Sequence, residues 1–199
     1  NIFKPYPQAP IRETLEIHKE SFIIIYSAEL VANTRKGYIF LVNALEHLKS
    51  LPHKKQLVIV TFGKNAQSKA QSLAYHSLSL GYIEKESELA LVYSMADVTV
   101  IPSLEDNLPN VALESLACGT PVVGFDVGGI PDMVEHKING YLAQLGDYKG
   151  IAEGICWVME QKRTGSKIRL KCRETALRRY ALPLQAQKYR DLYKKILNL

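Results

Sequence analysis

Short, continuous apolar runs alternate along this chain with segments whose apolar residues recur at helical spacing. Such runs are typical of strands that are buried on both faces of a sheet. Because strands that alternate with helices require crossover connections, the sequence predicts an α/β fold, a parallel sheet with helices on both faces. The predicted strands cover residues 22–28, 56–63, 97–102 and 120–125, with a further candidate at 76–81.

Helices are predicted at residues 37–50, 86–96, 109–118 and 147–161, and two more before residue 199. The last helix carries one apolar and aromatic stripe, formed by Tyr189, Leu192, Tyr193, Ile196 and Leu197. Three prolines in residues 1–10 predict an extended linker. The expected organisation is a linker over residues 1–10, a domain over 11–182 and a C-terminal helix over 183–199.

The composition excludes several classes of protein. With 199 residues, 47% of them apolar and 23% charged, the chain can bury the core of one globular domain. Its apolar runs are far shorter than the roughly 20 residues that span a bilayer. Cys118, Cys156 and Cys172 are too few and too far apart for a disulfide scaffold or a zinc site. They suit a reducing, cytoplasmic compartment.

Charge is divided unevenly along the chain. Residues 1–160 hold 13 Lys and Arg against 18 Asp and Glu, whereas residues 161–199 hold 12 against 2. This basic tail predicts contact with something anionic, such as a membrane surface, an acidic partner domain or nucleic acid. A solvated helical face is the alternative. No aromatic interleaving or known nucleic-acid motif accompanies the charge, so no nucleic-acid partner is expected.

Three turns after predicted strands carry the candidate chemistry, because ligands of an open parallel sheet bind outside the carboxyl ends of its strands. The first turn is Asn33-Thr-Arg-Lys-Gly37, where Arg35 and Lys36 precede a helix. Free N–H groups and the macrodipole favour anions at a helix N-terminus. The turn is therefore a candidate phosphate cradle, and a basic solvent loop is the alternative.

The second turn places Asp106 in a loop and Glu114 in the second turn of the following helix. The two carboxylates and the loop amides are expected to converge on one crevice, where they can bind sugar hydroxyls and phosphate oxygens. Alternatively, Asp106 caps the helix and Glu114 is a surface residue. The third turn, residues 124–132, contains Gly128-Gly129, which either lets backbone approach a ligand closely or forms an ordinary turn.

In this order and spacing, the three turns resemble the C-terminal half of family 4 glycosyltransferases. The resemblance covers nearly the whole chain and is most specific in residues 102–123, which resemble the family's two-acid motif. It implies one half of a GT-B enzyme, in which two Rossmann-like domains face each other across a cleft. Residues 1–10 would be the interdomain linker, residues 11–182 the donor-binding domain, and residues 183–199 a helix that packs toward the N-terminal domain.

The resemblance also implies roles for individual residues. Asp106 and Glu114 are the candidate catalytic pair, and Asp106 is preferred over Glu105 because it gives the family's spacing of seven residues between the acids. Lys36 would contact the donor diphosphate. Glu114 would accept hydrogen bonds from the ribose hydroxyls.

Further implied contacts concern the two ends of the donor. The donor sugar would meet Asp106 and the amides of Asn107 and Leu108, and Ile83 would flank the base. Many family members carry a Gly-Arg pair after the first strand, but this chain has Ala28 and Glu29 nearby. Arg35 is the candidate replacement for that arginine. The family uses no bound metal, so no metal or other cofactor is expected.

These expectations together describe the half of a retaining glycosyltransferase that binds a nucleoside-diphosphate sugar. The acceptor, a glycan or a lipid-linked molecule, would be bound by the N-terminal domain, so this fragment alone is expected to be inactive. The location would be cytoplasmic, with peripheral contact to the inner face of a membrane. The alternatives are another GT-B sugar enzyme, such as a phosphorylase or a nucleotide-sugar epimerase, and a noncatalytic module that binds anions through the basic tail.

Overall fold

The computed structural model describes residues 2–30, 34–51, 56–64, 66–70, 73 and 75–197. Six strands form one sheet in the order β3-β2-β1-β4-β5-β6, and every neighbouring pair is parallel. The predicted α/β class with a Rossmann-like parallel sheet is confirmed. The strands are β1 (Phe22–Leu30), β2 (Leu57–Lys64), β3 (His76–Ser79), β4 (Val98–Ile101), β5 (Val122–Phe125) and β6 (Gly140–Ala143).

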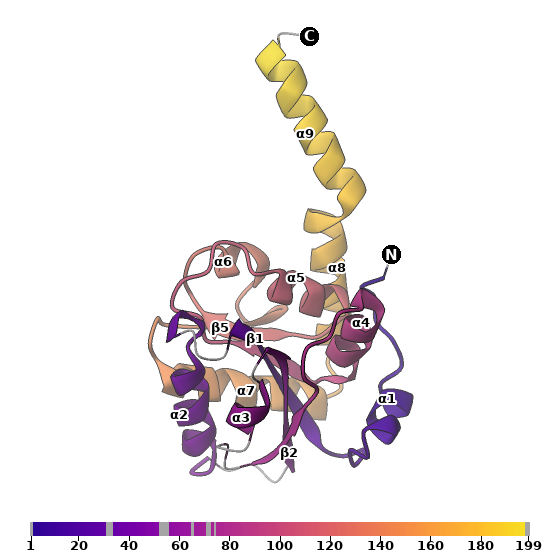
Figure 1. Cartoon of the computed structure of the whole chain (residues 1–199). Coiled ribbons are helices and arrows are strands. Elements are labelled where there is room, and N and C mark those ends of the chain that lie inside the picture. The colour runs from indigo at the N-terminus through magenta and orange to yellow at the C-terminus, as the bar shows by residue number, and fades with distance from the viewer. Residues whose placement is uncertain are drawn as a thin grey trace.

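Helices cover both faces of this sheet, with α1 and α4 on the opposite side from α2 and α7 (Figure 1). The helical elements are α1 (Gln8–Thr14), the 3-10 turn η1 (Thr34–Lys36), α2 (Tyr38–Leu48), α3 (Ala66–Ala70), α4 (Glu86–Met95), α5 (Asn110–Ala117), α6 (Ile130–Met133), α7 (Tyr148–Arg163), α8 (Ile168–Tyr180) and α9 (Leu182–Leu197).

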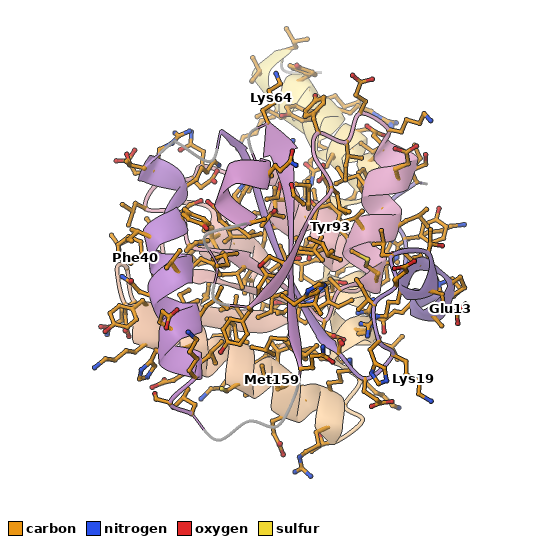
Figure 2. The ribbon with its side chains drawn as sticks, turned by 60° about the horizontal axis from the view of Figure 1, so that its bottom comes forward. Glu13, Lys19, Phe40, Lys64, Tyr93 and Met159 are labelled. Carbon is orange, nitrogen blue, oxygen red and sulfur yellow. The ribbon has the colours of Figure 1, made fainter. Side chains whose placement is uncertain are left out.

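The central strand β1 explains why the sheet is covered on both faces. Its side chains alternate between two hydrophobic cores, as the period of a strand requires. Phe22, Ile24 and Tyr26 belong to the core beneath α2 and α7, whereas Ile23 and Ile25 belong to the core beneath α4. Figure 2 shows the same division in Phe40 and Tyr93, which lie on opposite sides of the central strands.

The expectation of extended backbone over residues 1–10 is wrong from Gln8 onward, because the helix α1 begins there. Pro7 precedes the first helical residue and Pro10 lies in the first turn. The N–H groups of a first turn have no acceptor within the helix, so proline, which lacks this group, is tolerated there. The segment is also fastened to the domain. Arg173 donates hydrogen bonds through Nη1 to the carbonyl oxygens of Phe3 and Ala117, at 2.8 and 2.9 Å.

Three side chains satisfy the carbonyl groups at the C-terminal end of α4, which the helix itself leaves without donors. Gln8 and Arg169 each donate to the carbonyl oxygens of residues 94 and 96. Arg12 donates to the carbonyl oxygen of Met95 and pairs with the buried carboxylate of Asp97 at 3.1 Å. The beginning of the chain and α8 are thereby tied to the same end of α4.

The predicted C-terminal helix is present, and α9 projects away from the rest of the domain (Figure 1). None of its described residues is buried, and its predicted apolar stripe is exposed. Some cations of the basic tail pair with acidic side chains of the domain, although the Arg178 side chain remains 67% exposed. Arg178 and Arg179 both pair with Glu135, at 3.2 and 3.0 Å, and Lys162 pairs with Asp97 at 2.8 Å.

Candidate functional site

The order of the strands fixes where a ligand can bind. The chain adds β2 and β3 on one side of β1, and β4, β5 and β6 on the other, so the direction of winding reverses between β1 and β4. In open α/β sheets, ligands bind in the crevice outside the carboxyl ends of the strands at this switch point. Here the segments that emerge from these ends lead to η1 and to the loop of residues 102–109.

Lys36 and Asp106 meet at this place. The Lys36 Nζ atom lies 2.7 Å from Oδ2 of Asp106, although the residues are 70 positions apart. The side chains are 27% and 13% exposed, so water reaches the pair without surrounding it. The same two residues line a hollow of about 20 Å³ between the ends of β1 and β4, together with Tyr26, Ser27 and Pro102.

Glycines allow the three predicted turns to pack directly on one another. Gly37 has a φ of 69°, and a Cβ atom added to it would collide with the carbonyl oxygen of Pro102. Gly128 and Gly129 approach the carbonyl oxygens of Asp106 and Asn107 in the same way. The close approach expected of Gly128-Gly129 is therefore made to the neighbouring loop, and these contacts hold the loop that carries Asp106.

Main-chain hydrogen bonds join the same turns. The Leu104 amide donates to the Arg35 carbonyl at 2.8 Å, and the Gly129 amide donates to the Asp106 carbonyl at 3.0 Å. The hydroxyl of the buried Tyr26 donates to the Lys36 carbonyl at 3.2 Å. Both flanks of the hollow are therefore positioned by hydrogen bonds to main-chain carbonyl groups.

Glu114 does not share this hollow. It lines a larger groove of about 800 Å³ with residues of the N-terminal segment, α4, α8 and α9, among them Phe3, Glu86 and Arg173. The first turn of α5 separates the two spaces, because Pro109 and Val111 line the hollow whereas Asn110 lines the groove. The expectation that both carboxylates converge on one crevice is wrong. An extended ligand has to cross this turn to reach both acids.

The structure also tests the alternative that Asp106 caps α5 and that Glu114 is a surface residue. No side chain caps the N-terminus of α5, so Asp106 does not cap that helix. Glu114 is half-buried, and burial raises the pKa of its carboxyl group. Glu86 raises this pKa further, whereas the hydrogen bond from Tyr93 lowers it.

Sequence reasoning missed Tyr93, whose hydroxyl donates to Oε2 of Glu114 at 3.1 Å. Its helical spacing indicates only a core residue, and no local pattern reveals a contact with a side chain 21 positions later. Burial raises the pKa of Tyr93 well above its ordinary value, and the neighbouring Glu114 carboxylate adds to this. The phenol therefore keeps its proton at neutral pH and donates this hydrogen bond.

The other predicted site residues lie around these two spaces. Arg35 is exposed on η1, and Asn107 and Leu108 are exposed in the loop after Asp106. Within the described chain, no group accepts a hydrogen bond from the amides of Asn107 and Leu108. Ile83 is partly buried and packs against the core beneath α4, and neither space includes it.

Two sequence expectations concern the segment that follows the first apolar run. Asn33, the first residue of the candidate phosphate cradle, lies outside the described residues. Ala28 and Glu29 belong to β1, which continues to Leu30 and pairs there with Lys64 after an irregularity in register. The strand thus continues past the place where many family members carry Gly-Arg.

Within the described part of the chain, no group of three His, Cys, Asp or Glu residues could hold a metal ion. No helix in these residues has the length and apolar character needed to cross a membrane.

Residues 21–161 match the family described as glycosyl transferases group 1, a span that is most of the chain and includes Lys36, Asp106 and Glu114. The chain belongs to this family. It is 27% identical over 171 residues to the D-inositol 3-phosphate glycosyltransferase of Thermobispora bispora, an alignment that covers 80% of this chain and 40% of that protein. The chain therefore spans less than half the length of that relative.

Solved glycosyltransferases share the fold. Sucrose-phosphate synthase from Thermosynechococcus elongatus superposes with a TM-score of 0.80 at 26% identity, over 99% of this chain and 50% of that one. The Anabaena protein HepE, solved with UDP and glucose, also superposes with a TM-score of 0.80, at 20% identity, over 98% of this chain and 54% of that one. This chain has the fold of one GT-B domain.

Proposed function

We propose that this chain is the donor-binding half of a retaining glycosyltransferase and binds a nucleoside-diphosphate sugar. The observation that carries the proposal is the contact of Lys36 with Asp106 at the switch point of the sheet. A diphosphate and the sugar attached to it are neighbouring groups of one ligand. A cation for the former and a carboxylate for the latter must therefore lie side by side, as these two residues do.

The residues suit the charge that develops during transfer. When the sugar leaves the donor, negative charge builds up on the phosphate oxygen and positive character develops at the sugar. A site that works without a metal has to stabilise that negative charge with fixed cations and amides. Lys36 and the N-terminus of α2, which begins after Gly37, supply them here, and Arg35 on the same turn is a second candidate.

The two acids and the loop amides would hold the rest of the donor. Asp106 and the unpaired amides of Asn107 and Leu108 face the sugar, whose hydroxyl groups both accept and donate hydrogen bonds. Glu114 accepts hydrogen bonds from the ribose hydroxyls in the larger groove. The donor then crosses the first turn of α5 between the two spaces, with the base on the side of Ile83.

Calorimetric titration of the chain with UDP, GDP and ADP, with the matching nucleosides and with inorganic phosphate tests this proposal. We expect one nucleoside diphosphate to bind and its nucleoside to bind at least tenfold more weakly, because a charge-assisted phosphate contact contributes about 1.5–3 kcal/mol. Binding of phosphate in the absence of nucleotide binding would instead identify a phosphorylase-like site. Binding of neither would refute the proposal.

Activity assays on the same protein test whether donor and acceptor are bound by two different domains. Since the relative described above is more than twice as long as the aligned segment, we propose that a preceding domain binds the acceptor and covers the exposed stripe of α9. Donor hydrolysis and sugar transfer by this chain alone should then be undetectable. Efficient transfer without any further domain would contradict this assignment.

Peripheral membrane contact through the basic tail is the remaining part of the proposal. Lys188, Arg190, Lys194 and Lys195 are exposed on α9. Sedimentation with anionic vesicles should be lost at high salt and when these residues are neutralised. Neutralising Arg178 and Arg179 is a less direct test, because both pair with Glu135.

A further inference from the structure

The phenol of Tyr93 is the hydrogen-bond donor that the described chain directs at the Glu114 carboxylate. Tyr93 lies on α4 and Glu114 on α5, so the contact joins two helices on the wall of the larger groove. The hydroxyl reaches Oε2 at 3.1 Å, and no described residue donates to Oε1. One carboxylate oxygen is thereby held while the other remains available to a ligand.

The ring of Tyr93 is fixed before any ligand arrives. Its side chain is fully buried and packs against Phe62 at a centroid distance of 5.8 Å and against Phe3 at 6.5 Å. The backbone beneath it is also held, because the Thr120 hydroxyl donates to the Tyr93 carbonyl at 2.7 Å. A tyrosine side chain has few rotatable bonds. Because the ring is closely packed, its hydroxyl oxygen is held in place beside the Glu114 carboxylate.

Glu114 needs such a donor because of the groups around it. Among the described residues, no cation forms an ion pair with its carboxylate, and Glu86 lines the same groove. Arg173 lines that groove too, but its guanidinium donates to the carbonyl oxygens of Phe3 and Ala117. A half-buried carboxylate without a cation loses solvation, and a hydrogen bond from a neutral phenol favours its ionised form.

We propose that Tyr93 is a positioning residue that aims the Glu114 carboxylate at the ribose of the bound nucleotide and thereby sets the preference for ribose over dideoxyribose. This inference rests on the proposed function, because it takes Glu114 as the ribose-binding residue. An ionised carboxylate accepts hydrogen bonds at about four positions. With one of them occupied by Tyr93, the remaining ones point in fixed directions and can receive two adjacent hydroxyl groups.

The test compares the dissociation constants of the ribonucleoside diphosphate that binds and of its 2′,3′-dideoxy analogue, which lacks both hydroxyl groups that Glu114 would receive. The wild-type chain should prefer the ribose form about tenfold or more, since hydrogen bonds to a charged group are lost with the hydroxyl groups. Tyr93→Phe should weaken binding of the ribose form about five- to tenfold and leave the dideoxy form nearly unchanged, because only the ribose form can donate to the Glu114 carboxylate. The ratio between the two ligands should therefore fall toward one.

A matched control removes another buried phenol oxygen. The Tyr75 hydroxyl is buried without a hydrogen-bond partner among the described residues, and it lines neither space. Tyr75→Phe should leave the ratio at the wild-type value. Should Tyr93→Phe fail to fold, p-fluorophenylalanine in place of Tyr93 fills most of the lost volume but cannot donate, and it should lower the ratio equally.

A double-mutant cycle shows whether Tyr93 affects ligand binding through the Glu114 carboxylate. If Tyr93 acts through the carboxylate, Tyr93→Phe should change nothing further in a Glu114→Gln background. An unchanged ratio in Tyr93→Phe, or equal weakening of both ligands, would overturn the inference while the proposed function stands. Wild-type protein that binds no nucleoside diphosphate would instead overturn the proposed function, and the inference with it.

Discussion

Lys36 Nζ and Asp106 Oδ2 lie 2.7 Å apart across the ends of β1 and β4, so the cation and the acid of the candidate site are held against each other. The pair is partly open to water and lies at the end of the sheet where ligands of open α/β sheets bind. Its place at the switch point therefore indicates a role in binding.

Replacing Lys36 tests this role. Lys36→Met should weaken nucleoside-diphosphate binding about ten- to a hundredfold, because the diphosphate loses a charge-assisted hydrogen bond. Calorimetry should find the affinity for the matching nucleoside unchanged. Lys49→Met is the control, since Lys49 pairs with Glu46 at 2.8 Å beyond the far end of α2. Equal effects of the two substitutions would contradict a diphosphate site at Lys36.

Glu114→Gln should change stability and affinity in opposite directions. Burial raises the pKa of Glu114 above its ordinary value of 4.5, so the folded protein holds this proton more tightly than the unfolded chain. The free energy of unfolding therefore falls as pH rises from the unfolded pKa through the folded one. Removing the charge should stabilise the protein at pH 7 and make little difference at pH 4, while weakening nucleotide binding at pH 7.

Urea unfolding at the two pH values provides the measurement for this prediction. Glu88→Gln is a suitable control, because Glu88 lies on the same helix as Tyr93 but is exposed and paired with Lys85 at 3.0 Å. A loss of stability in Glu114→Gln at pH 7 would show that the carboxylate is structural.

Gly37→Ala should break the contact between two turns of the site. A residue other than glycine at a φ near 69° costs about 1–2 kcal/mol by itself. The added Cβ would also collide with the Pro102 carbonyl, so the total loss should exceed about 3 kcal/mol. Gly165→Ala separates the two causes, because Gly165 has a φ of 66° and open space around it. Similar melting temperatures for both variants would refute the packing argument.

Asp97→Asn should be among the most destabilising single changes in the chain. Asp97 is buried, pairs with Arg12 and Lys162, and accepts a hydrogen bond from the Ile23 amide at 2.8 Å. Removing one partner of a buried ion pair typically costs about 3–5 kcal/mol, because the other charge is left unpaired. Denaturant titration should give a loss of that size, whereas Glu174→Gln, in an exposed pair with Lys171, should cause little change.

Deleting residues 182–199 should leave the melting temperature nearly unchanged, because none of the described residues of α9 is buried. The same deletion should reduce self-association at high protein concentration, since it removes the exposed stripe that includes Leu192, Tyr193 and Ile196. Analytical ultracentrifugation and thermal unfolding measure the two effects. A large drop in melting temperature would show that α9 packs on this domain in solution.

Local patterns predicted most of the sheet. Each of the five predicted strands has bounds within two residues of the observed ones. Four of them are buried on both faces and leave an apolar run, whereas the edge strand β3 is only partly buried. The edge strand β6 was missed, since its four residues form no such run and two of them are only half-buried. The short helices α1, α3 and α6 offer too few turns for a period to be recognised.

The site was predictable as three turns but not as an arrangement in space. Strand ends and helix starts identify Lys36, Asp106 and Glu114 as candidates. Which of them touch depends on strand order, and the separation of Glu114 from the other two depends on the path of the first turn of α5. The bond from Tyr93 depends on how α4 packs beside α5, which no local pattern encodes.

The glycine contacts among the three turns determine which residues of the site can be substituted without loss of the fold. Because main-chain atoms lock these loops together, exposed side chains such as Asn107 and Leu108 contribute little to holding them in place. Libraries that vary these two positions should yield folded proteins in high proportion. Substitutions at these positions can therefore alter which sugar is bound while the backbone of the loop keeps its place.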